Sequence, residues 1–284
     1  ILGCDAVQIH EASGIGEYHG PRSQMLRCID HPTMVRDGVG WGAPTGVTAG
    51  ILAQNGFTGA PALTCQGPQW RSLGNSWKLV TDTHYKPYPC CRWSHPSIDA
   101  AAELMARHAL SHHDIASVVI KTFHNATRLA GHTPVSADEF AYSIAFPVAC
   151  MIVRGQVGVP ELDISALSNP EILRISTATT LIDDPHLTQI SDGKRWAQVS
   201  ILMRDGTRHE AAPRTPRGDT DLPLSDREIS NKYHIFADPI LGAETARRIE
   251  TLCAEFDHLD AGGVQGLLDI ILRKPGVTEP IPNH

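Results

Sequence analysis

The side chains best suited to chemistry lie in one ten-residue segment, Lys86–His95. Its sequence, Lys-Pro-Tyr-Pro-Cys-Cys-Arg-Trp-Ser-His, combines an ammonium, a phenol, two thiols, a guanidinium, a hydroxyl and an imidazole. Two prolines stiffen the segment, and a helix is predicted directly after it, where the helix dipole would favour an anion. Lysine is scarce here, with six lysines against 18 arginines, so Lys86 is an unusual choice for routine surface charge.

Two interpretations of this segment stay open at the level of the residues. The prolines and aromatic rings could simply brace the edge of a domain, with His95 as a helix cap. Alternatively, the polar side chains are presented to an anionic substrate, because functional groups concentrate on loops held by a rigid element. In that case the residues that would face the anion are Lys86, Tyr88, Arg92, Ser94 and His95.

A second group of cations lies near the start of the chain, at Arg22, Arg27, His31 and Arg36. Arginine binds carboxylates through two parallel hydrogen bonds, so three arginines within fifteen residues suit a di- or tricarboxylic acid. A solvated helix face, with Asp30 and Asp37 as ion-pair partners, explains the same residues and is slightly favoured.

His108, His112 and His113 resemble a metal-binding cluster. However, they lie at the end of a predicted helix, where the macrodipole favours cations, and no carboxylate motif completes a site. We therefore predict no metal. The chain also lacks a glycine-rich nucleotide loop, a serine nucleophile elbow and a His-Glu-x-x-His motif, so an enzyme of this kind would rely on acid–base side chains.

The composition describes a globular protein with one large or two modest domains: 284 residues, 42% hydrophobic and 19% charged. A net charge of −7 argues against a nucleic-acid partner, and no apolar run reaches the length of a membrane span. Seven scattered cysteines favour reduced thiols in the cytoplasm over a disulfide framework. The start at Ile1, without methionine or a signal-peptide layout, suggests part of a longer protein.

The order of predicted elements indicates an α+β fold. A helix of small residues is predicted around 47–55 and a linker over 61–76. The next predicted elements are a strand at 77–80, a helix at 96–110, a strand at 115–123 and a capped helix from 136 to 154, interrupted near Pro147. A hairpin over 198–211 and helices at 226–236, 241–257 and 262–273 come last. We expect residues 1–70 and 221–284 to form one helical domain from both chain ends, with an α+β lid over 71–220 inserted between them.

Four runs in this order resemble the MmgE/PrpD family, which includes 2-methylcitrate dehydratase, cis-aconitate decarboxylase and iminodisuccinate epimerase. The runs begin at Asp37 (Asp-Gly-Val-Gly-Trp-Gly-Ala-Pro-Thr-Gly), at Leu52 (Leu-Ala-Gln-Asn-Gly-Phe-Thr-Gly-Ala-Pro), at Lys86 (given above) and at Phe140 (Phe-Ala-Tyr-Ser-Ile-Ala-Phe-Pro-Val-Ala). The resemblance implies the same helical domain and lid, and a cytosolic homodimer with its active site between the domains. It also implies that neither a metal nor an iron–sulfur cluster is needed, so no cofactor is expected. Members are usually longer at the N-terminus, so this chain resembles the C-terminal portion.

The resemblance also carries site residues. The family's loop lysine matches Lys86, while a second family lysine aligns near Arg36, where arginine keeps the charge but cannot transfer a proton. The loop histidine of the family aligns with either Cys91 or His95. The stretch that lines the site in relatives matches Tyr142 and Ser143.

From the residues and the resemblance together we predict a metal-independent lyase of the dehydratase type, similar to 2-methylcitrate dehydratase, acting on a small di- or tricarboxylic acid. Proton removal next to a carboxylate would be followed by loss of hydroxide. Epimerisation or decarboxylation on the same scaffold, or a silent truncated chain, are the alternatives. The predicted catalytic residues are Lys86, His95 and Tyr88, and the predicted substrate-binding residues are Arg22, Arg36, Cys91, Arg92, Ser94, Tyr142 and Ser143.

Overall fold

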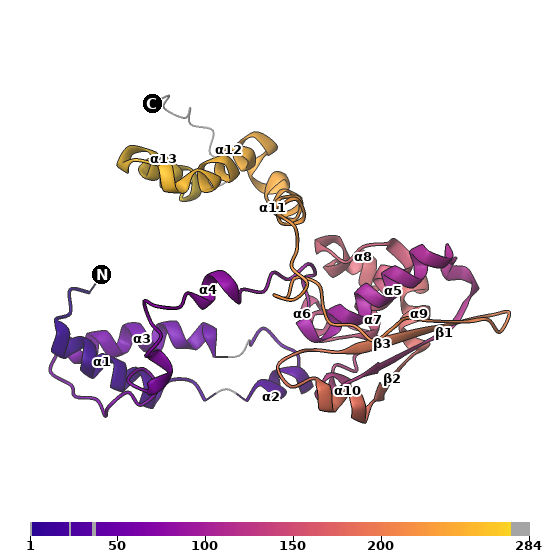
Figure 1. Cartoon of the computed structure of the whole chain (residues 1–284), viewed down its shortest axis with the longest axis horizontal. Coiled ribbons are helices and arrows are strands. Elements are labelled where there is room, and N and C mark those ends of the chain that lie inside the picture. The colour runs from indigo at the N-terminus through magenta and orange to yellow at the C-terminus, as the bar shows by residue number, and fades with distance from the viewer. Residues whose placement is uncertain (1, 23, 36–37, 274–284) are drawn as a thin grey trace. The chain divides into compact units, whose positions relative to one another are not determined.

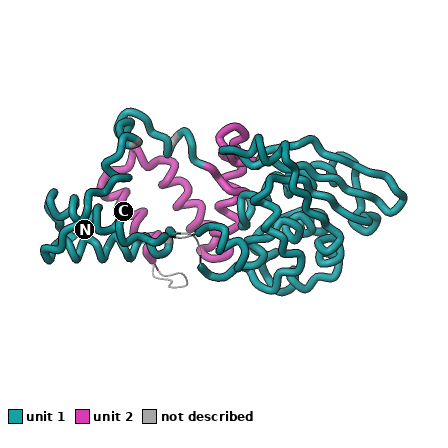
Figure 2. The backbone as a smooth tube through the Cα atoms, turned by 90° about the horizontal axis from the view of Figure 1, so that it is seen from below, with its two compact units in different colours: residues 1–83, 88–216 teal, residues 84–87, 217–284 magenta. Residues whose placement is uncertain are grey.

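The computed structural model describes residues 2–22, 24–35 and 38–273 (Figure 1). The chain divides into two units, and each is considered by itself below. The first comprises residues 1–83 and 88–216, and the second comprises residues 84–87 and 217–284 (Figure 2). The segment expected to carry the chemistry is therefore shared: Lys86 belongs to the second unit, and residues from Tyr88 onward belong to the first.

The first unit contains helices, short 3-10 turns and one sheet. Its helices are α1 (Ala6–His19), α2 (Met25–Asp30), α3 (Val39–Gln54), α4 (Lys78–Thr81), α5 (His95–His108), α6 (Ala137–Ala141), α7 (Ala145–Arg154), α8 (Ile164–Leu167), α9 (Pro170–Thr177) and α10 (Pro185–Ile190). The 3-10 turns are η1 (Pro68–Trp70), η2 (Arg92–Ser94), η3 (His112–Asp114), η4 (His124–Arg128) and η5 (Val159–Leu162). The strands are β1 (Ile115–Thr122), β2 (Thr179–Asp183), β3 (Ala197–Met203) and β4 (Arg208–Glu210).

Residues 88–216, called the α/β body from here on, are built around a four-stranded sheet of order β2-β1-β3-β4. Strand β1 runs parallel to β2 and antiparallel to β3, with Ile120 opposite Leu181 on one side and Val199 on the other. Alternate β1 residues are buried, as a half-buried strand requires. Helices α5 and α9 pack on the sheet and α7 packs on both of them, so the core lies between this helical layer and the strands (Figure 1).

Helices α1 and α3, called the helix pair from here on, pack on each other through a small apolar contact of Ile15 with Ala49 and Ala53. The chain that follows α3 lies directly on α1. There the Gly59 N–H donates to the Glu11 carboxylate at 2.6 Å. Helix α2 joins the α/β body instead, because its Ile29 lies in that core.

The second unit contains α11 (Asp226–Leu241), α12 (Ala243–Ala254), the turn η6 (Phe256–His258) and α13 (Ala261–Ile271). Ile249, Leu267 and Ile270 form its small apolar core. Residues 84–87 lie against the start of its C-terminal stretch, where the Tyr85 N–H donates to the Gly218 carbonyl at 2.9 Å.

Several predicted elements are confirmed. Helix α5 starts with Pro96 in its first turn, where a missing N–H costs nothing. The β3–β4 hairpin turns at Asp205 and Gly206, and Gly206 has the positive φ (+90°) that this turn needs. Helix α11 is capped by Ser225 and Glu228 through reciprocal hydrogen bonds, as the capping box predicted. The α+β fold class is confirmed as well.

Other expectations were wrong. Residues 77–80 were expected to form a strand, but the Asp82 N–H donates to the Lys78 carbonyl at 2.7 Å in the short helix α4. A strand needs a neighbour to pair with, and the described sheet offers this segment none. The helix expected to be interrupted near Pro147 breaks earlier, between α6 and α7, and Pro147 lies in the first turn of α7, where proline is tolerated.

Strand β2 was not predicted, because its short sequence contains only a brief alternating pattern and its partner β1 lies far away in the chain. The division into a lid and a helical domain built from both chain ends stays a prediction. Among the described residues, no helix has both the length and the apolar character needed to cross a membrane.

Candidate functional site

The 88–95 segment is anchored to the loop between α6 and α7. The Cys91 N–H donates to the Ala141 carbonyl at 2.8 Å, and the Ser94 hydroxyl donates to the Ser143 carbonyl at 2.8 Å. Ser143 in turn donates its hydroxyl to the Gly131 carbonyl and accepts from the Phe146 N–H at 3.2 Å. These bonds bring together two stretches that the sequence singled out separately, around Ser94 and around Ser143.

Tyr88, His95 and Asp99 form a buried polar cluster behind this segment. The Tyr88 hydroxyl donates to the Asp99 carboxylate at 2.7 Å, and the Tyr88 and His95 rings meet edge to face at 5.2 Å. The His95 Nε2 lies 3.2 Å from the Cys90 carbonyl. A carbonyl can only accept, so Nε2 carries a proton in this contact. The cluster therefore holds the phenol and orients the imidazole.

Burial divides the predicted residues into two groups. Tyr88, Ser94, His95 and Ser143 are buried, and His95 has no exposed surface at all. A substrate cannot touch the His95 ring in this conformation, so its role as an acid or base stays a prediction. The residues with accessible surface are Arg22, Lys86, Cys91, Arg92 and Tyr142.

Lys86 is exposed and lies in the second unit. Its backbone carbonyl accepts a hydrogen bond from the Lys232 ammonium at 2.6 Å. Burial lowers the pKa of Lys232, and the nearby charge of Lys86 lowers it further. Lys232 also lines a largely apolar groove of about 450 Å³ together with Tyr85, Ile229, Tyr233, Phe236, Ala237, Ile240 and Leu241. Sequence reasoning missed this lysine, since nothing in its local sequence distinguishes it.

Two residues of the N-terminal charged group have described contacts. Arg22 is exposed and donates to the Tyr18 carbonyl at the end of α1, at 3.0 Å. Asp30 accepts from Arg128 at 2.9 Å, and the role of the arginines as carboxylate ligands stays a prediction. Arg36 and Asp37 lie outside the described residues.

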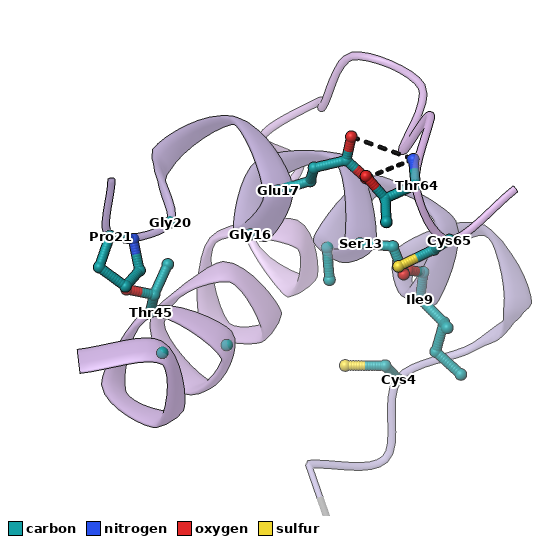
Figure 3. A pocket seen from close by; sticks show the side chains of 13 residues that line it. Cys4, Ile9, Ser13, Gly16, Glu17, Gly20, Pro21, Thr45, Thr64 and Cys65 are labelled. Atoms are coloured by element: carbon teal, nitrogen blue, oxygen red, sulfur yellow. Dashed lines mark hydrogen bonds between the residues drawn. The ribbon is translucent and has the colours of Figure 1, made fainter. Parts of the chain in front are cut away.

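The helix pair contains a pocket of about 530 Å³, lined by parts of α1 and α3 and by Thr64 and Cys65 (Figure 3). Its one charged lining residue, Glu17, is an anion that accepts from the Thr64 N–H at 3.0 Å. A carboxylate ligand needs cations or N–H donors. The described residues that line this pocket include no cation, and the Thr64 N–H already donates to Glu17. The pocket is therefore a poor candidate for the acid site.

Asp99 is the polar residue of the cluster that sequence reasoning missed. It follows His95 by four positions in α5, so both side chains lie on one face of the helix. That spacing was the available signal. Burial raises the pKa of the Cys150 thiol to about 12, so Cys150 is a poor nucleophile.

Residues that could hold a metal lie elsewhere in the α/β body, at His112, His113 and Glu171. His108, the third histidine of the predicted cluster, instead stacks on His209 with ring centroids 4.3 Å apart.

Comparison with known proteins matches a large part of the chain to one family. The family model of the MmgE/PrpD C-terminal domain matches residues 88–258, more than half of the chain. The chain belongs to the MmgE/PrpD family. The resemblance inferred from the four sequence motifs is thereby confirmed, and the matched range begins at the 88–95 segment.

Curated MmgE/PrpD relatives include human cis-aconitate decarboxylase, 23% identical over 213 residues that cover 73% of this chain and 44% of the relative. The mouse cis-aconitate decarboxylase is 22% identical, covering 70% and 41% respectively. The cis-aconitate decarboxylase-like protein oryM of Aspergillus oryzae is 24% identical, covering 84% and 53%. This MmgE/PrpD chain thus spans about half the length of the curated relatives it matches.

Proposed function

We propose that this chain is part of a lyase that decarboxylates a small polycarboxylic acid of the cis-aconitate type. The observation that carries the proposal is the family membership together with three relatives that have decarboxylase names. The acidic net charge and the missing nucleotide motifs agree with a small-molecule substrate that needs local cations rather than a basic surface.

The reaction sets clear demands on the protein. The bond between a carbon atom and a carboxylate breaks, carbon dioxide leaves, and the electron pair stays on the carbon until one proton is delivered to it. The remaining carboxylates must be held by cations, and the developing negative charge must be stabilised. A side chain that can donate a proton must then reach the carbon.

The accessible residues of the segment supply the cations. We assign Lys86 and Arg92 to the substrate carboxylates, because an ammonium and a guanidinium both donate charge-assisted hydrogen bonds to such groups. Cys91 and Tyr142 are assigned to the surface around them. Arg22 and Arg36 stay predictions as further carboxylate ligands.

The buried residues would act mainly by positioning. Ser94 and Ser143 fix the segment to the loop after α6, while Asp99 holds the Tyr88 hydroxyl. Tyr88 and His95 stay our candidates for proton transfer, which requires the segment to move so that a substrate can reach them. Tyr88→Phe should therefore lower kcat without abolishing substrate binding.

Dehydration of a 2-methylcitrate-like acid is the second candidate, since it passes through a similar carbanion and needs the same cations. We rank it second because the matched relatives have decarboxylase names. We also propose, on the family resemblance, a cytoplasmic homodimer that needs no metal for the reaction, which light scattering and metal-chelator treatment would check.

The test is to incubate the purified protein with cis-aconitate, 2-methylcitrate or iminodisuccinate in deuterated water and to follow each by NMR. Decarboxylation predicts loss of one carboxyl carbon from cis-aconitate and one deuterium on the product. Water loss from 2-methylcitrate would favour the dehydratase, and deuterium exchange in iminodisuccinate alone would favour an epimerase. No turnover of any of the three acids would contradict the lyase proposal and would support the alternative that this chain is catalytically inactive.

Lys86 can be tested in the same assay. Lys86→Ala should lower kcat/KM by about 10²-fold, because a charge-stabilising group is lost. Lys78→Ala is the matched control, since this lysine is also exposed and lies only eight positions earlier. Equal kcat/KM for Lys86→Ala and the unsubstituted protein would remove Lys86 from the site.

A further inference from the structure

Three potential metal ligands from two distant parts of the chain meet at one edge of the α/β body. His112 and His113 belong to η3, between α5 and β1, and Glu171 lies in the first turn of α9. The His112 Nδ1 is 3.6 Å from the Glu171 Oε2, and the His113 Nδ1 is 3.8 Å from the same oxygen. We propose that these three side chains form a binding site for a divalent transition metal, best suited to Zn²⁺.

The distances fit such a site. Zinc binds imidazole nitrogen and carboxylate oxygen at about 2.0–2.2 Å, so two ligand atoms of a tetrahedral site lie about 3.4 Å apart. The two nitrogen–oxygen distances exceed this by only a few tenths of an ångström. The three ligand atoms all lie within 4.8 Å of one another, so small side-chain rotations would bring them around one ion.

Glu171 is prepared to act as an anionic ligand. A hydrogen bond from Arg174, reinforced by the Arg174 charge, holds the pKa of Glu171 below its ordinary value. The guanidinium donates to the Glu171 Oε2 at 3.0 and 3.1 Å and to the His112 carbonyl at 2.8 Å. Carboxylates that bind metals are typically oriented by such hydrogen bonds. The positive charge of Arg174 also opposes a cation, so we expect only micromolar affinity.

The histidines differ in a way that suits a surface metal site. The His112 Nδ1 is buried and, among the described residues, has no hydrogen-bond partner, so an ion would satisfy it. The His113 side chain is 71% exposed, which leaves a path for an ion to enter. Three protein ligands leave a fourth position for water. Two imidazoles and one carboxylate favour zinc over magnesium or calcium, which prefer oxygen ligands only.

The site is separate from the one proposed for the substrate. Helix α5 starts at His95 and has 14 residues, so it is about 21 Å long, and η3 follows its far end. A metal at η3 would connect the link between α5 and β1 to α9 and stabilise the α/β body. It would take no part in proton transfer.

The test is a zinc titration of protein freed of metal by a chelator, in competition with a chromophoric zinc indicator. One zinc ion per chain should bind, and thermal unfolding should shift upward when Zn²⁺ is added. His113→Ala and Glu171→Gln should each weaken this binding at least about tenfold and remove the thermal shift. Because His113 is exposed, its replacement should leave the fold intact, which circular dichroism would check.

His186→Ala is the matched control, since this exposed histidine lies in α10, outside the cluster, and zinc binding should not change. Co²⁺ in place of Zn²⁺ separates this site from the free cysteines, because thiolate ligands add an intense charge-transfer band that nitrogen and oxygen ligands lack. The proposal is overturned if His113→Ala and Glu171→Gln bind zinc as the unsubstituted protein does. It is also overturned if the tightest cobalt site shows the thiolate band.

Discussion

Helices α5 and α3 are of similar length, with 14 and 16 residues, but they bury very different side chains. In α5, every residue from His95 to Ala101 is buried, Leu104 is buried as well, and Ile98 has no exposed surface. Helix α3 is the more apolar of the two, yet among its described side chains only small residues such as Ala49 and Ala53 are buried. Its Trp41 remains 68% exposed.

The difference shows that apolar composition alone does not produce a core. Helix α5 is stabilised because the sheet and α7 cover its apolar face. The helix pair packs instead through small residues, and the chain after α3 approaches the α1 backbone closely: a methyl group at Gly14 would overlap the Ala60 carbonyl oxygen, and one at Gly59 would overlap that of Glu11. The α/β body therefore depends on large buried side chains, and the helix pair depends on small ones.

A matched pair of isoleucine substitutions tests this comparison with the largest expected effect. Ile98→Ala should lower the free energy of unfolding by about 3–4 kcal/mol, because it leaves a cavity under a fully buried side chain. Ile51→Ala in α3, where 47% of the residue is exposed, should cost less than about 1 kcal/mol. Urea unfolding measures both. Similar costs for the two variants would contradict the comparison.

Two glycines in α1 give the second test. Gly14→Ala should destabilise the helix pair by about 1–3 kcal/mol, because the new methyl group forces the Ala60 backbone away. At Gly16 a methyl group would make an ordinary contact with Ala49 at 3.8 Å, so Gly16→Ala should be neutral or stabilise by up to about 1 kcal/mol. Hydrogen exchange in α1 and α3 measures the effect. Faster exchange in both variants would contradict this assignment, because a methyl group at Gly16 meets no close backbone atom.

The C-terminal helices add a third case to the comparison of stabilising contacts, because charged side chains of α11 and α12 contact each other there. His234 joins Asp238 at 2.7 Å and Glu250 at 2.9 Å, which raises the pKa of His234, mainly through Asp238. Hydrogen bonds from Ser230 and then His234 lower the pKa of Glu250. The His234 contribution is complete below its ordinary pKa near 6.5 and is lost as the pH rises through the raised value. The Glu250 contribution is present above about 4.5 and is lost as the pH falls through the lowered value.

The C-terminal helices should therefore be most stable between about pH 4.5 and 6.5 and should weaken toward alkaline pH. Hydrogen exchange in α11 and α12 across this range measures the effect, which should be the smallest of the three. His234→Gln is the control and should remove the alkaline decline. An unchanged decline in that variant would mean that another group causes it.

Local sequence signals were sufficient to predict an element where its own residues favour one conformation. Pro96 and the apolar spacing after it predicted α5, and the Asp205-Gly206 turn predicted the β3–β4 hairpin. Residues 77–80 show the opposite case, since an apolar, β-prone run became a helix without a strand to pair with. Strand β2 could not be predicted because its parallel partner is supplied by a crossover through several helices.

The candidate site shows the same limit. The sequence identified the 88–95 segment and Ser143, but it did not indicate that His95 would be buried while Lys86 would stay exposed. Burial depends on what covers a residue, which local patterns do not record. Similarly, no carboxylate motif marked a metal site at the histidines of η3, and the packing of α9 brings Glu171 to them.

The pairing of Tyr85 with Gly218 has a consequence for how this chain could change over time. The polypeptide leaves the C-terminal helices after residue 87 and comes back at residue 217, and the two crossing points are neighbours joined by a backbone hydrogen bond. An insertion whose two ends lie close together can be lengthened, shortened or replaced by another domain with closely spaced termini. The C-terminal helices could keep their packing when this happens. The core of the α/β body also contains Ile29 of α2, so such an exchange would have to supply a surface that covers Ile29.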